Sequence, residues 1–294
     1  MNRAELTQYG LLEATGNDAR SFLHAQLTND IEGLAADQVR YAGWCSAKGR
    51  LLASFLVVPH ADGYLLQLAR DLAPAVAKRL SMFILRSQVK ITDASAAWAQ
   101  FGLWGPESDA ALAGLGIEAP AEDLQIARHE SILAVRVSRH RCLLLAPATE
   151  RARLAALPGA SDASDWALEE IRGGRPLITQ ATQDQFVPQM VNYERFGALD
   201  FQKGCYPGQE IVARAQYRGQ VKRRMVRVRT PLPLRPGQDL YSDDLPGQAS
   251  GTVVNAAGDE ALAVVQISTL EKGLAMRAES HGAPLELLPL PYAA

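Results

Sequence analysis

The 294-residue sequence has little cysteine, no long apolar run and no marked excess of either charge. Its three cysteines, Cys45, Cys142 and Cys205, are too few and too scattered for a disulfide framework or a CxxC metal site. The longest mostly apolar run, Leu51–Val58, is too short to cross a bilayer, and the N-terminus lacks the apolar core of a secretion signal. These absences predict a globular protein of the cytoplasm, with no membrane partner.

Several catalytic signatures are also missing. The five histidines show no metal-ligand spacing, and the sequence contains no Ser-His-Asp set, P-loop or Rossmann glycine fingerprint. A net charge of −2 means that any binding of nucleic acid must come from a local basic patch. The residues therefore favour a ligand-binding protein with one candidate reactive thiol over a hydrolase, kinase or dehydrogenase.

The first third of the chain predicts an α+β unit. Residues 17–28 have helical spacing, and residues 41–45, 51–58 and 64–68 alternate with turns like a three-stranded meander. A helix capped by Asp71 follows, with Val76, Leu80, Phe83 and Ile84 on one face, and residues 89–92 return as a strand. Strands followed by a helix and a further strand are typical of helices packed on one face of a sheet.

The rest of the chain predicts a mixed segment followed by a small β-barrel. Pro106 opens a helix, strands are expected at residues 125–127, 132–137 and 141–145, and helices at 148–157 and from Asp165 to the Gly173-Gly174 stop. Short strands then alternate with Pro/Gly turns at residues 225–229, 238–241, 251–255 and 262–267. We place a domain boundary near residue 218.

The most informative motif is Lys-Gly-Cys-Tyr-Pro-Gly-Gln-Glu at residues 203–210, which continues as Ile-Val-Ala-Arg to Arg214. Pro207-Gly208 is strong turn chemistry, and basic neighbours such as Lys203 favour the thiolate form of a cysteine. The motif is therefore a candidate for an activated thiol at Cys205. The alternative is a turn before a strand, with Cys205 as a small buried hydrophobe.

Three further features each permit two interpretations. Trp166, at a helix start, is either part of the core or an aromatic wall for a flat heterocycle. The segment 44–50 is either a hairpin with basic flanks or a loop that places Lys48 or Arg50 on an anion. Residues 214–229 are either a charged edge strand or a surface for a polyanion, such as RNA phosphate or a polyglutamate tail. This stretch contains no acid and seven basic residues: Arg214, Arg218, Lys222, Arg223, Arg224, Arg227 and Arg229.

The cysteine motif, with Phe186-Val-Pro-Gln189 and Asn192 before it, resembles the YgfZ family of folate-binding proteins. The resemblance covers nearly the whole chain, including Phe22–Asp30, Cys45–Gly49 and Leu288–Tyr292. The family is related to the tetrahydrofolate-dependent aminomethyltransferase of glycine cleavage and to a mitochondrial iron–sulfur assembly factor. It implies a three-domain cloverleaf ring around a folate channel, with a C-terminal β-barrel. The expected divisions are a discontinuous folate-binding domain at 1–30 and 105–217, an inserted α+β domain at 31–104, and the barrel at 218–294.

The resemblance also implies a function and its residues. We expect a folate-binding accessory protein that supports iron–sulfur proteins and thereby tRNA thiolation, with tetrahydrofolate or a one-carbon derivative as cofactor. Its expected partners are iron–sulfur proteins such as tRNA-thiolating enzymes, with direct tRNA contact an open possibility. The expected folate residues are Trp166, Tyr9, Gln189, Asn192 and Glu170. The expected chemistry rests on Cys205 and Lys203, and the expected anion contacts are Lys48, Arg214 and Arg223.

Two departures from the aminomethyltransferase pattern argue against that enzyme's reaction. Its acidic pair corresponds here to Ala53 and Ser54, which removes the expected general acid or base. A pterin-contacting Glu corresponds to Arg172, so the contact is expected to shift to Glu169 or Glu170. Two rival functions stay open: a one-carbon transferase with Cys205 as nucleophile, and an RNA-binding module that uses residues 214–229.

Overall fold

The computed structural model describes residues 1–217, 219, 221–279 and 281–292, and the chain forms two compact units. Unit 1 comprises Met1–Ala25, Asp30–Ala42 and Phe55–Trp166. Unit 2 comprises Gln26–Asn29, Gly43–Ser54 and Ala167–Ala294. The chain therefore passes between the units several times, and the short segment 26–29 belongs to unit 2 although both its neighbours belong to unit 1.

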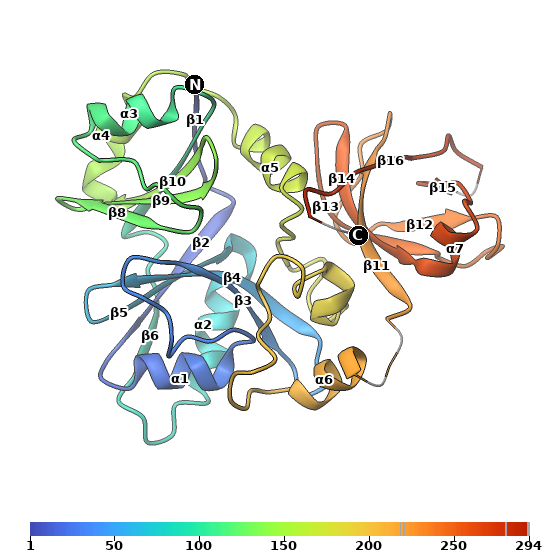
Figure 1. The fold of residues 1–294 in the computed structure, drawn as a ribbon, viewed down its shortest axis with the longest axis horizontal. Coiled ribbons are helices and arrows are strands. Elements are labelled where there is room, and N and C mark those ends of the chain that lie inside the picture. Colours follow the sequence, from blue (N-terminus) through green and yellow to red (C-terminus); the bar gives the residue numbers. More distant parts are fainter. Residues whose placement is uncertain (218, 220, 280, 293–294) are drawn as a thin grey trace. The chain divides into compact units, whose positions relative to one another are not determined.

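The N-terminal half of the chain builds two sheets. Their strand orders are β1-β7-β10-β9-β8 and β3-β4-β5-β2-β6. Figure 1 follows the elements of this half from blue to green. In chain order they are β1 (Asn2–Glu5), β2 (Tyr9–Thr15), α1 (Ala19–Gln26), β3 (Arg40–Cys45), β4 (Leu51–His60), β5 (Gly63–Ala69), the 3-10 helix η1 (Arg70–Leu72), α2 (Ala73–Ser81), β6 (Lys90–Asp93), β7 (Trp98–Trp104), α3 (Ser108–Gly114), β8 (Ile126–His129), β9 (Ile132–Ser138), β10 (Arg141–Pro147), the 3-10 helix η2 (Ala148–Glu150) and α4 (Arg151–Ala155).

The two faces of the β1-β7-β10-β9-β8 sheet differ in character. Because side chains alternate along a strand, Phe101 and Leu103 of β7 point to one face, where they pack with Leu112 of α3 and Leu154 of α4. Gln100, Gly102 and Trp104 of the same strand lie on the opposite face. This second face holds polar and aromatic residues rather than a purely aliphatic core.

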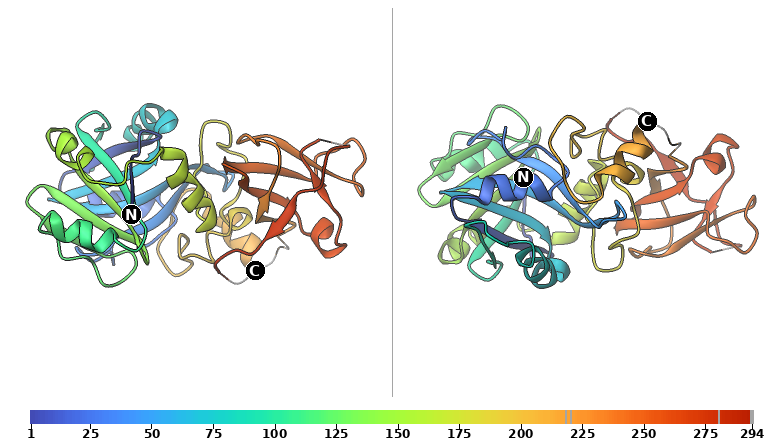
Figure 2. Two further views of the ribbon diagram at one scale, coloured as in Figure 1. Left: turned by 90° about the horizontal axis from the view of Figure 1, so that it is seen from above. Right: turned by 90° about the horizontal axis from the view of Figure 1, so that it is seen from below.

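The C-terminal sheet curls around its own core. Its strand order is β15-β12-β13-β14-β11-β16, and the Leu285 N–H donates to the Met276 carbonyl at 2.8 Å, which joins the two ends. Val228, Leu240 and Val253 lie in the interior, and both views of Figure 2 show the curl. The elements from residue 163 onward are α5 (Ala163–Arg172), the 3-10 helix η3 (Pro188–Val191), α6 (Gln209–Tyr217), β11 (Arg223–Arg229), β12 (Asp239–Ser242), β13 (Gly251–Ala257), β14 (Glu260–Gln266), α7 (Ile267–Glu271), β15 (Met276–Arg277) and β16 (Glu286–Leu288).

The predicted α+β class and the curled C-terminal sheet are confirmed. The meander, the helix after Pro106 and the four barrel strands all lie within two to three residues of their expected bounds. Three helices are shorter than predicted: α1 spans only Ala19–Gln26, α2 ends at Ser81 and leaves Phe83 and Ile84 beyond it, and the expected helix at 148–157 is the 3-10 turn η2 followed by α4, which ends at Ala155. The strands β1, β2 and β7 and the helix α6 were not anticipated. The division into three domains stays a prediction.

No helix in the described ranges is both long and apolar enough to cross a membrane.

Candidate functional site

Cys205 differs from the other two cysteines in exposure. Its thiol is exposed, whereas Cys45 and Cys142 are free but buried. Burial raises the pKa of Cys142 to about 11 and that of Cys45 further, so both are inert thiols near neutral pH. Cys205 is therefore the thiol that a partner molecule in solution reaches. The alternative of a buried cysteine before a strand is wrong on both points, because the helix α6 follows the turn.

The loop that carries Cys205, residues 203–208, is packed against a second turn by a close approach of two glycines. Gly208 has φ +80°, and a Cβ atom on it would lie 2.3 Å from the Ser46 carbonyl oxygen and 2.7 Å from Gly49 N and Cα. Gly49, at φ +69°, would meet Gly208 O at 3.1 Å in the same way. We call these two segments the cysteine loop (203–208) and the lysine turn (46–49). Only glycine fits at either contact.

The lysine turn is itself tightly hydrogen-bonded. Ser46 N–H donates to the Arg50 carbonyl at 2.8 Å, and Gly49 N–H donates to the Ser46 carbonyl at 2.8 Å. The Ser46 hydroxyl donates to Asp184 Oδ1 at 2.9 Å. Lys48, at the tip, is exposed. The structure thus brings the lysine turn against the cysteine loop and leaves the predicted anion contact facing solvent.

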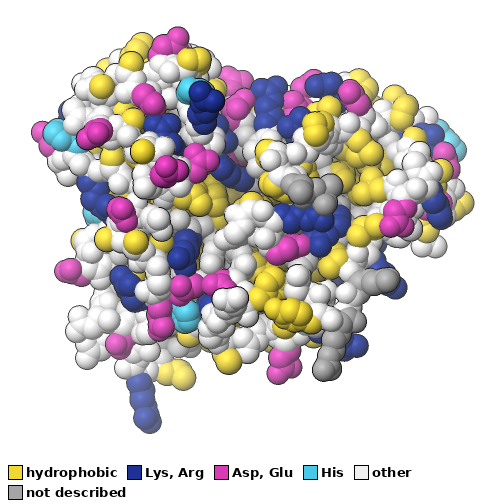
Figure 3. All heavy atoms as spheres, viewed as in Figure 1, with side chains coloured by type: hydrophobic (Ala, Val, Ile, Leu, Met, Phe, Trp, Pro, Cys, Tyr) yellow, Lys and Arg dark blue, Asp and Glu magenta, His cyan; other side chains and the backbone are white. Residues whose placement is uncertain are grey.

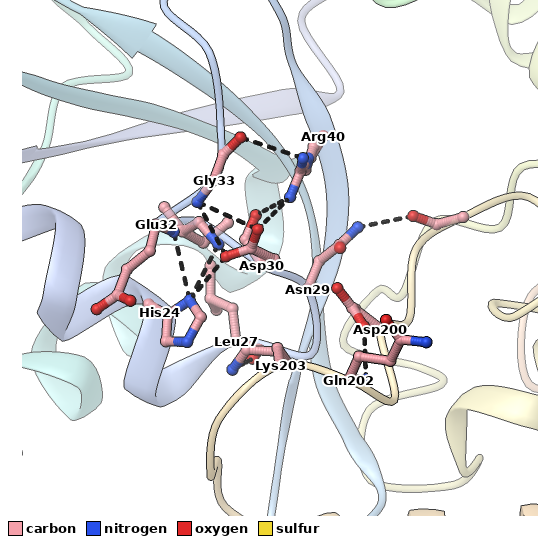
Figure 4. A network of polar contacts seen from close by, with 12 residues as sticks. His24, Leu27, Asn29, Asp30, Glu32, Gly33, Arg40, Asp200, Gln202 and Lys203 are labelled. Atoms are coloured by element: carbon pink, nitrogen blue, oxygen red, sulfur yellow. Dashed lines mark hydrogen bonds and ion pairs between the residues drawn. The ribbon is translucent and has the colours of Figure 1, made fainter.

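Lys203 anchors the start of the cysteine loop. Its ammonium donates to the Leu27 carbonyl at 2.9 Å, and Figure 4 shows the two residues side by side. The ammonium also lies 4.9 Å from the centroid of the Tyr206 ring. Tyr206 is 9% exposed, and burial raises the pKa of its phenol. Lys203 therefore ties the loop to the segment 26–29, in addition to any role that its charge has toward the thiol.

Gln189 and Asn192 form hydrogen bonds to the elements that follow the cysteine loop. The Gln189 amide N–H donates to the Val212 carbonyl of α6 at 2.7 Å, and the Asn192 amide N–H donates to the Met225 carbonyl of β11 at 2.9 Å. Both side chains are almost fully buried, and Gln189 Oε1 and Asn192 Oδ1 have no hydrogen-bond partner among the described residues. A buried acceptor without a donor costs about 1–3 kcal/mol, which makes these two oxygens candidates for ligand contact.

Ala53 and Ser54, which stand where the aminomethyltransferase pattern has an acidic pair, are both buried in the fold. Ala53 is fully buried, and Ser54 is 7% exposed. The Ser54 hydroxyl accepts the Ile178 N–H at 2.9 Å. Neither residue supplies a carboxylate, so the structure agrees with the absence of an acid or base on this strand.

Arg172 belongs to an ion-pair network. Its guanidinium donates to Glu260 Oε1 at 3.1 Å and to Glu169 Oε1 at 2.9 Å. Glu260 is only 4% exposed and also pairs with Arg227 at 3.4 Å. Arg172 therefore compensates a buried carboxylate. Glu170, on the same helix, is half-buried, and its carbonyl accepts the Arg175 N–H at 3.0 Å.

Trp166 and Tyr9 lie in unit 1 and are both buried. The Trp166 ring is 2% exposed, packs on Gly102 of β7 and has the Arg141 guanidinium 4.5 Å from its centroid. The Tyr9 carbonyl accepts the Gln100 amide N–H at 3.2 Å. Gln100 and Gly102 share a face of β7, so both aromatic residues are linked to that face.

Acids pair with half of the described basic residues of the predicted surface at 214–229. Arg224 pairs with Glu194, Arg227 with Glu260, and Arg229 with Asp259 and Glu286. Arg214, Lys222 and Arg223 make no ion pair with a described residue, and Arg218 lies outside the described residues. The strand β11 pairs with both β14 and β16, so the charged edge strand is wrong, and three of its four arginines are paired with acids.

Two polar residues near the cysteine loop were not singled out from the sequence. The buried Thr28 hydroxyl donates to the Ala198 carbonyl at 2.8 Å and accepts the Gly43 N–H at 2.7 Å. The Asn29 amide donates to the Gly197 carbonyl at 2.7 Å. Together they hold the chain that leads into the loop. The run of three polar residues, Thr-Asn-Asp, directly after a helix was the feature of the sequence that could have indicated them.

Asp30 forms a separate polar network in unit 1 (Figure 4). Its carboxylate accepts the Gly33 N–H at 3.0 Å, pairs with Arg40 at 3.1 Å and lies 3.1 Å from His24 Nδ1. Burial raises the pKa of Asp30, but the hydrogen bonds and charges of these partners lower it more, and it ends below its usual value. In the part of the chain that the structure describes, no group of three His, Cys, Asp or Glu residues forms a metal site.

Comparisons with known proteins agree with this architecture. Residues 3–145 match the GCVT N-terminal domain family. The crystal structure of glycine cleavage system aminomethyltransferase T from Bartonella henselae has a similar fold, with a TM-score of 0.76 and 17% identity over 99% of this chain and 85% of that chain. The protein is thus one with an aminomethyltransferase-like fold.

Sequence relatives define the family more closely. The tRNA-modifying protein YgfZ of Vibrio vulnificus (strain YJ016) is 34% identical over 226 residues, which are 76% of this chain and 68% of the relative. The protein of the same name from Sodalis glossinidius (strain morsitans) is 32% identical over 305 residues, covering 98% of this chain and 92% of the relative. The chain belongs to the YgfZ family, as the cysteine motif predicted.

Proposed function

We propose that this protein is a cytoplasmic folate-binding accessory factor that supports tRNA modification, acting through iron–sulfur proteins such as tRNA-thiolating enzymes. The relatives are named tRNA-modifying proteins, which supports the tRNA part of the proposal. The aminomethyltransferase-like fold supports the folate part. The iron–sulfur part follows from the thiol, since cysteine thiolates are the ligands that such clusters take.

The observation that carries the proposal is the exposed thiol of Cys205 on a braced loop. Lys203 anchors one end of the loop, and the Gly208 contact with the lysine turn fixes the other. Cys205 also stands four residues before α6, and the N-terminal end of a helix favours a nearby anion. A thiol in this setting is suited to hold a one-carbon unit, a partner thiol or a cluster intermediate.

The described residues offer a folate polar partners, but all of them are buried. The orphaned oxygens of Gln189 and Asn192 are acceptors for the N–H groups that a pterin carries, and a pterin reaches them only after these side chains are uncovered. Trp166 is also buried, so stacking on its ring requires the Arg141 side chain to move. When bound, tetrahydrofolate would supply the one-carbon carrier. Gln189, Asn192 and Glu170 would form the polar contacts of its site.

A folate-dependent one-carbon transferase with Cys205 as nucleophile is the alternative. It is weakened because Ala53 and Ser54 supply no acid or base, and the Ser54 hydroxyl already accepts a backbone N–H. Turnover of 5,10-methylene or 5-formyl tetrahydrofolate by the purified protein would favour it. The absence of turnover with a broad panel of acceptors would exclude the transferase and favour the accessory role.

The thiol is tested by replacing it in cells. The Cys205→Ala variant is expected to reduce tRNA thiolation and iron–sulfur enzyme activity to the level of cells that lack the protein. Cys45→Ala is the matched control, because that thiol is buried and its pKa is raised. Wild-type thiolation in the Cys205→Ala strain would contradict the thiol role.

Folate binding is tested separately by titration with tetrahydrofolate. Saturable quenching of tryptophan fluorescence is expected, and Gln189→Leu and Asn192→Leu should each weaken it while leaving the thermal transition in place. A linear response without saturation would contradict the folate claim, whatever the result for Cys205.

A further inference from the structure

A second basic segment lies in unit 1, where α2 leads into β6. Residues 78–90 contain four cationic side chains, Lys78, Arg79, Arg86 and Lys90, and no Asp or Glu. All four are exposed. We call this stretch the basic segment (78–90).

The tip of the basic segment is apolar as well as exposed. Met82 is 71% exposed, Phe83 45% and Leu85 88%, so three large hydrophobic side chains face solvent within four residues. Figure 1 places this loop at the lower left, and Figure 3 shows a hydrophobic and a basic side chain projecting from the same edge. Such a concentration of apolar surface, flanked by charge, marks an interaction site rather than scattered surface residues.

Hydrogen bonds anchor the loop of the basic segment at both ends. The Gln88 N–H donates to Asp18 Oδ2 at 2.7 Å, and its carbonyl accepts the Asp18 N–H at 3.3 Å. At the other end, Met82 and Phe83 donate backbone N–H groups to the last turn of α2. These hydrogen bonds hold the two ends of the loop, and Met82, Phe83 and Leu85 between them are exposed.

The basic segment and β11 differ in how many of their charges are paired with acids. Three arginines of β11 are paired with acids, as described above. Lys78, Arg86 and Lys90 make no ion pair with any residue that the structure describes. Each of the two basic stretches therefore keeps three cations without an ion pair to a described residue, and those of the basic segment flank the exposed apolar tip.

We propose that the basic segment (78–90) is an RNA-contact surface, which binds the tRNA that the proposed function requires. Its cations would contact phosphates on both sides of the tip, and the apolar tip would insert against an unstacked base of a loop or end. The inference rests on the proposed tRNA role, which is what favours RNA over an anionic lipid surface. It places an RNA contact in unit 1, in addition to the one considered for residues 214–229.

The test measures binding of a fluorescently labelled tRNA transcript by anisotropy at several salt concentrations. Arg86→Gln/Lys90→Gln is expected to weaken binding about tenfold or more at low salt and to reduce the slope of log K against log salt by about 1.4, at about 0.7 per lost phosphate contact. Leu85→Ala should weaken binding a few-fold at every salt concentration and leave the slope unchanged. The matched control is Arg229→Gln/Arg277→Gln, which removes the same charge from arginines that are already paired with acids.

The outcomes separate this inference from the proposed function. Binding of the basic-segment variants equal to wild type, or loss of binding equal to that of the control pair, would overturn the RNA contact. Loss of binding to phosphatidylglycerol vesicles with unchanged tRNA affinity would overturn it in favour of a lipid surface. Cys205→Ala should keep full tRNA affinity, so a failure of the thiol role would leave tRNA binding intact, and the reverse also holds.

Discussion

Gly49 and Gly208 lie in backbone contact, although 159 residues separate them, and this contact joins the lysine turn to the cysteine loop. A Cβ atom on Gly208 would overlap the backbone of the lysine turn, and one on Gly49 would crowd Gly208 O and the Ile211 side chain. The position of the Cys205 loop thus depends on two residues that carry no chemistry themselves.

Replacing Gly208 by alanine should displace the cysteine loop. An alanine there must adopt φ +80° and place its Cβ 2.3 Å from the Ser46 carbonyl oxygen, which we expect to cost about 2–4 kcal/mol of unfolding free energy. Urea unfolding gives the cost, and tRNA thiolation in cells should fall although the thiol is present.

Gly197→Ala is the control for backbone strain alone. Gly197 has φ +74°, but a Cβ on it would meet nothing within 4 Å. We expect a loss of about 1 kcal/mol and normal thiolation. Equal losses for the two variants would show that the contact between the lysine turn and the cysteine loop contributes nothing.

Thiol labelling should distinguish Cys205 from the other cysteines. With an aromatic disulfide reagent at pH 8, the native protein is expected to release one equivalent rapidly, because only Cys205 is exposed and burial raises the pKa of Cys142 to about 11. Unfolding in guanidinium should release all three equivalents. A rapid native reaction that persists in Cys205→Ala would contradict this assignment.

Alternation and turn residues were enough to predict the meander and the barrel strands, because those strands have clear boundaries in Gly and Pro. The strand β7 escaped prediction for a physical reason. It is buried on both faces, so its polarity does not alternate, and its Gly102 is explained only by the Trp166 ring that packs on it.

The candidate site likewise combines features that the sequence predicts with features that depend on contacts between distant residues. The motif at 203–210 pointed to the family and singled out Cys205, which is the exposed cysteine. The helix α6 could not be predicted, since Ile211 and Val212 favour strands and the turn at Gly208 that starts the helix is stabilised by distant residues. The Gly49 contact, the Lys203 anchor on Leu27 and the neutralisation of β11 all join parts of the chain that are far apart in sequence.

Reversing the charge at Arg172 tests its structural role. Arg172→Glu would introduce the carboxylate expected from the aminomethyltransferase pattern, but it places that carboxylate beside the buried Glu260. We expect a loss of about 3 kcal/mol in unfolding free energy, because a buried charge loses a partner and gains a repulsive neighbour.

Arg153→Glu is the matched control for Arg172→Glu. Arg153 also pairs with a glutamate three residues away and with a second, distant glutamate, but that second partner, Glu130, is 61% exposed. Its reversal should cost about 1 kcal/mol or less. If the two reversals cost the same, the burial of Glu260 has no energetic consequence.

Stability should depend on the Asp30 carboxylate in a defined pH range. The partners of Asp30 hold its pKa below the usual value of about 4. A carboxyl group whose pKa is lowered on folding stabilises the native state above its unfolded pKa, and the contribution disappears as the pH falls through the folded pKa. We therefore expect Asp30→Asn to lose about 1–2 kcal/mol relative to wild type between pH 5 and 8, and this difference should shrink below pH 4.

Asp62→Asn is the control. It removes the same charge from an exposed turn without an ion pair to any described residue, so it should leave the unfolding free energy unchanged across the range. A constant difference between wild type and Asp30→Asn down to pH 3 would contradict the lowered pKa.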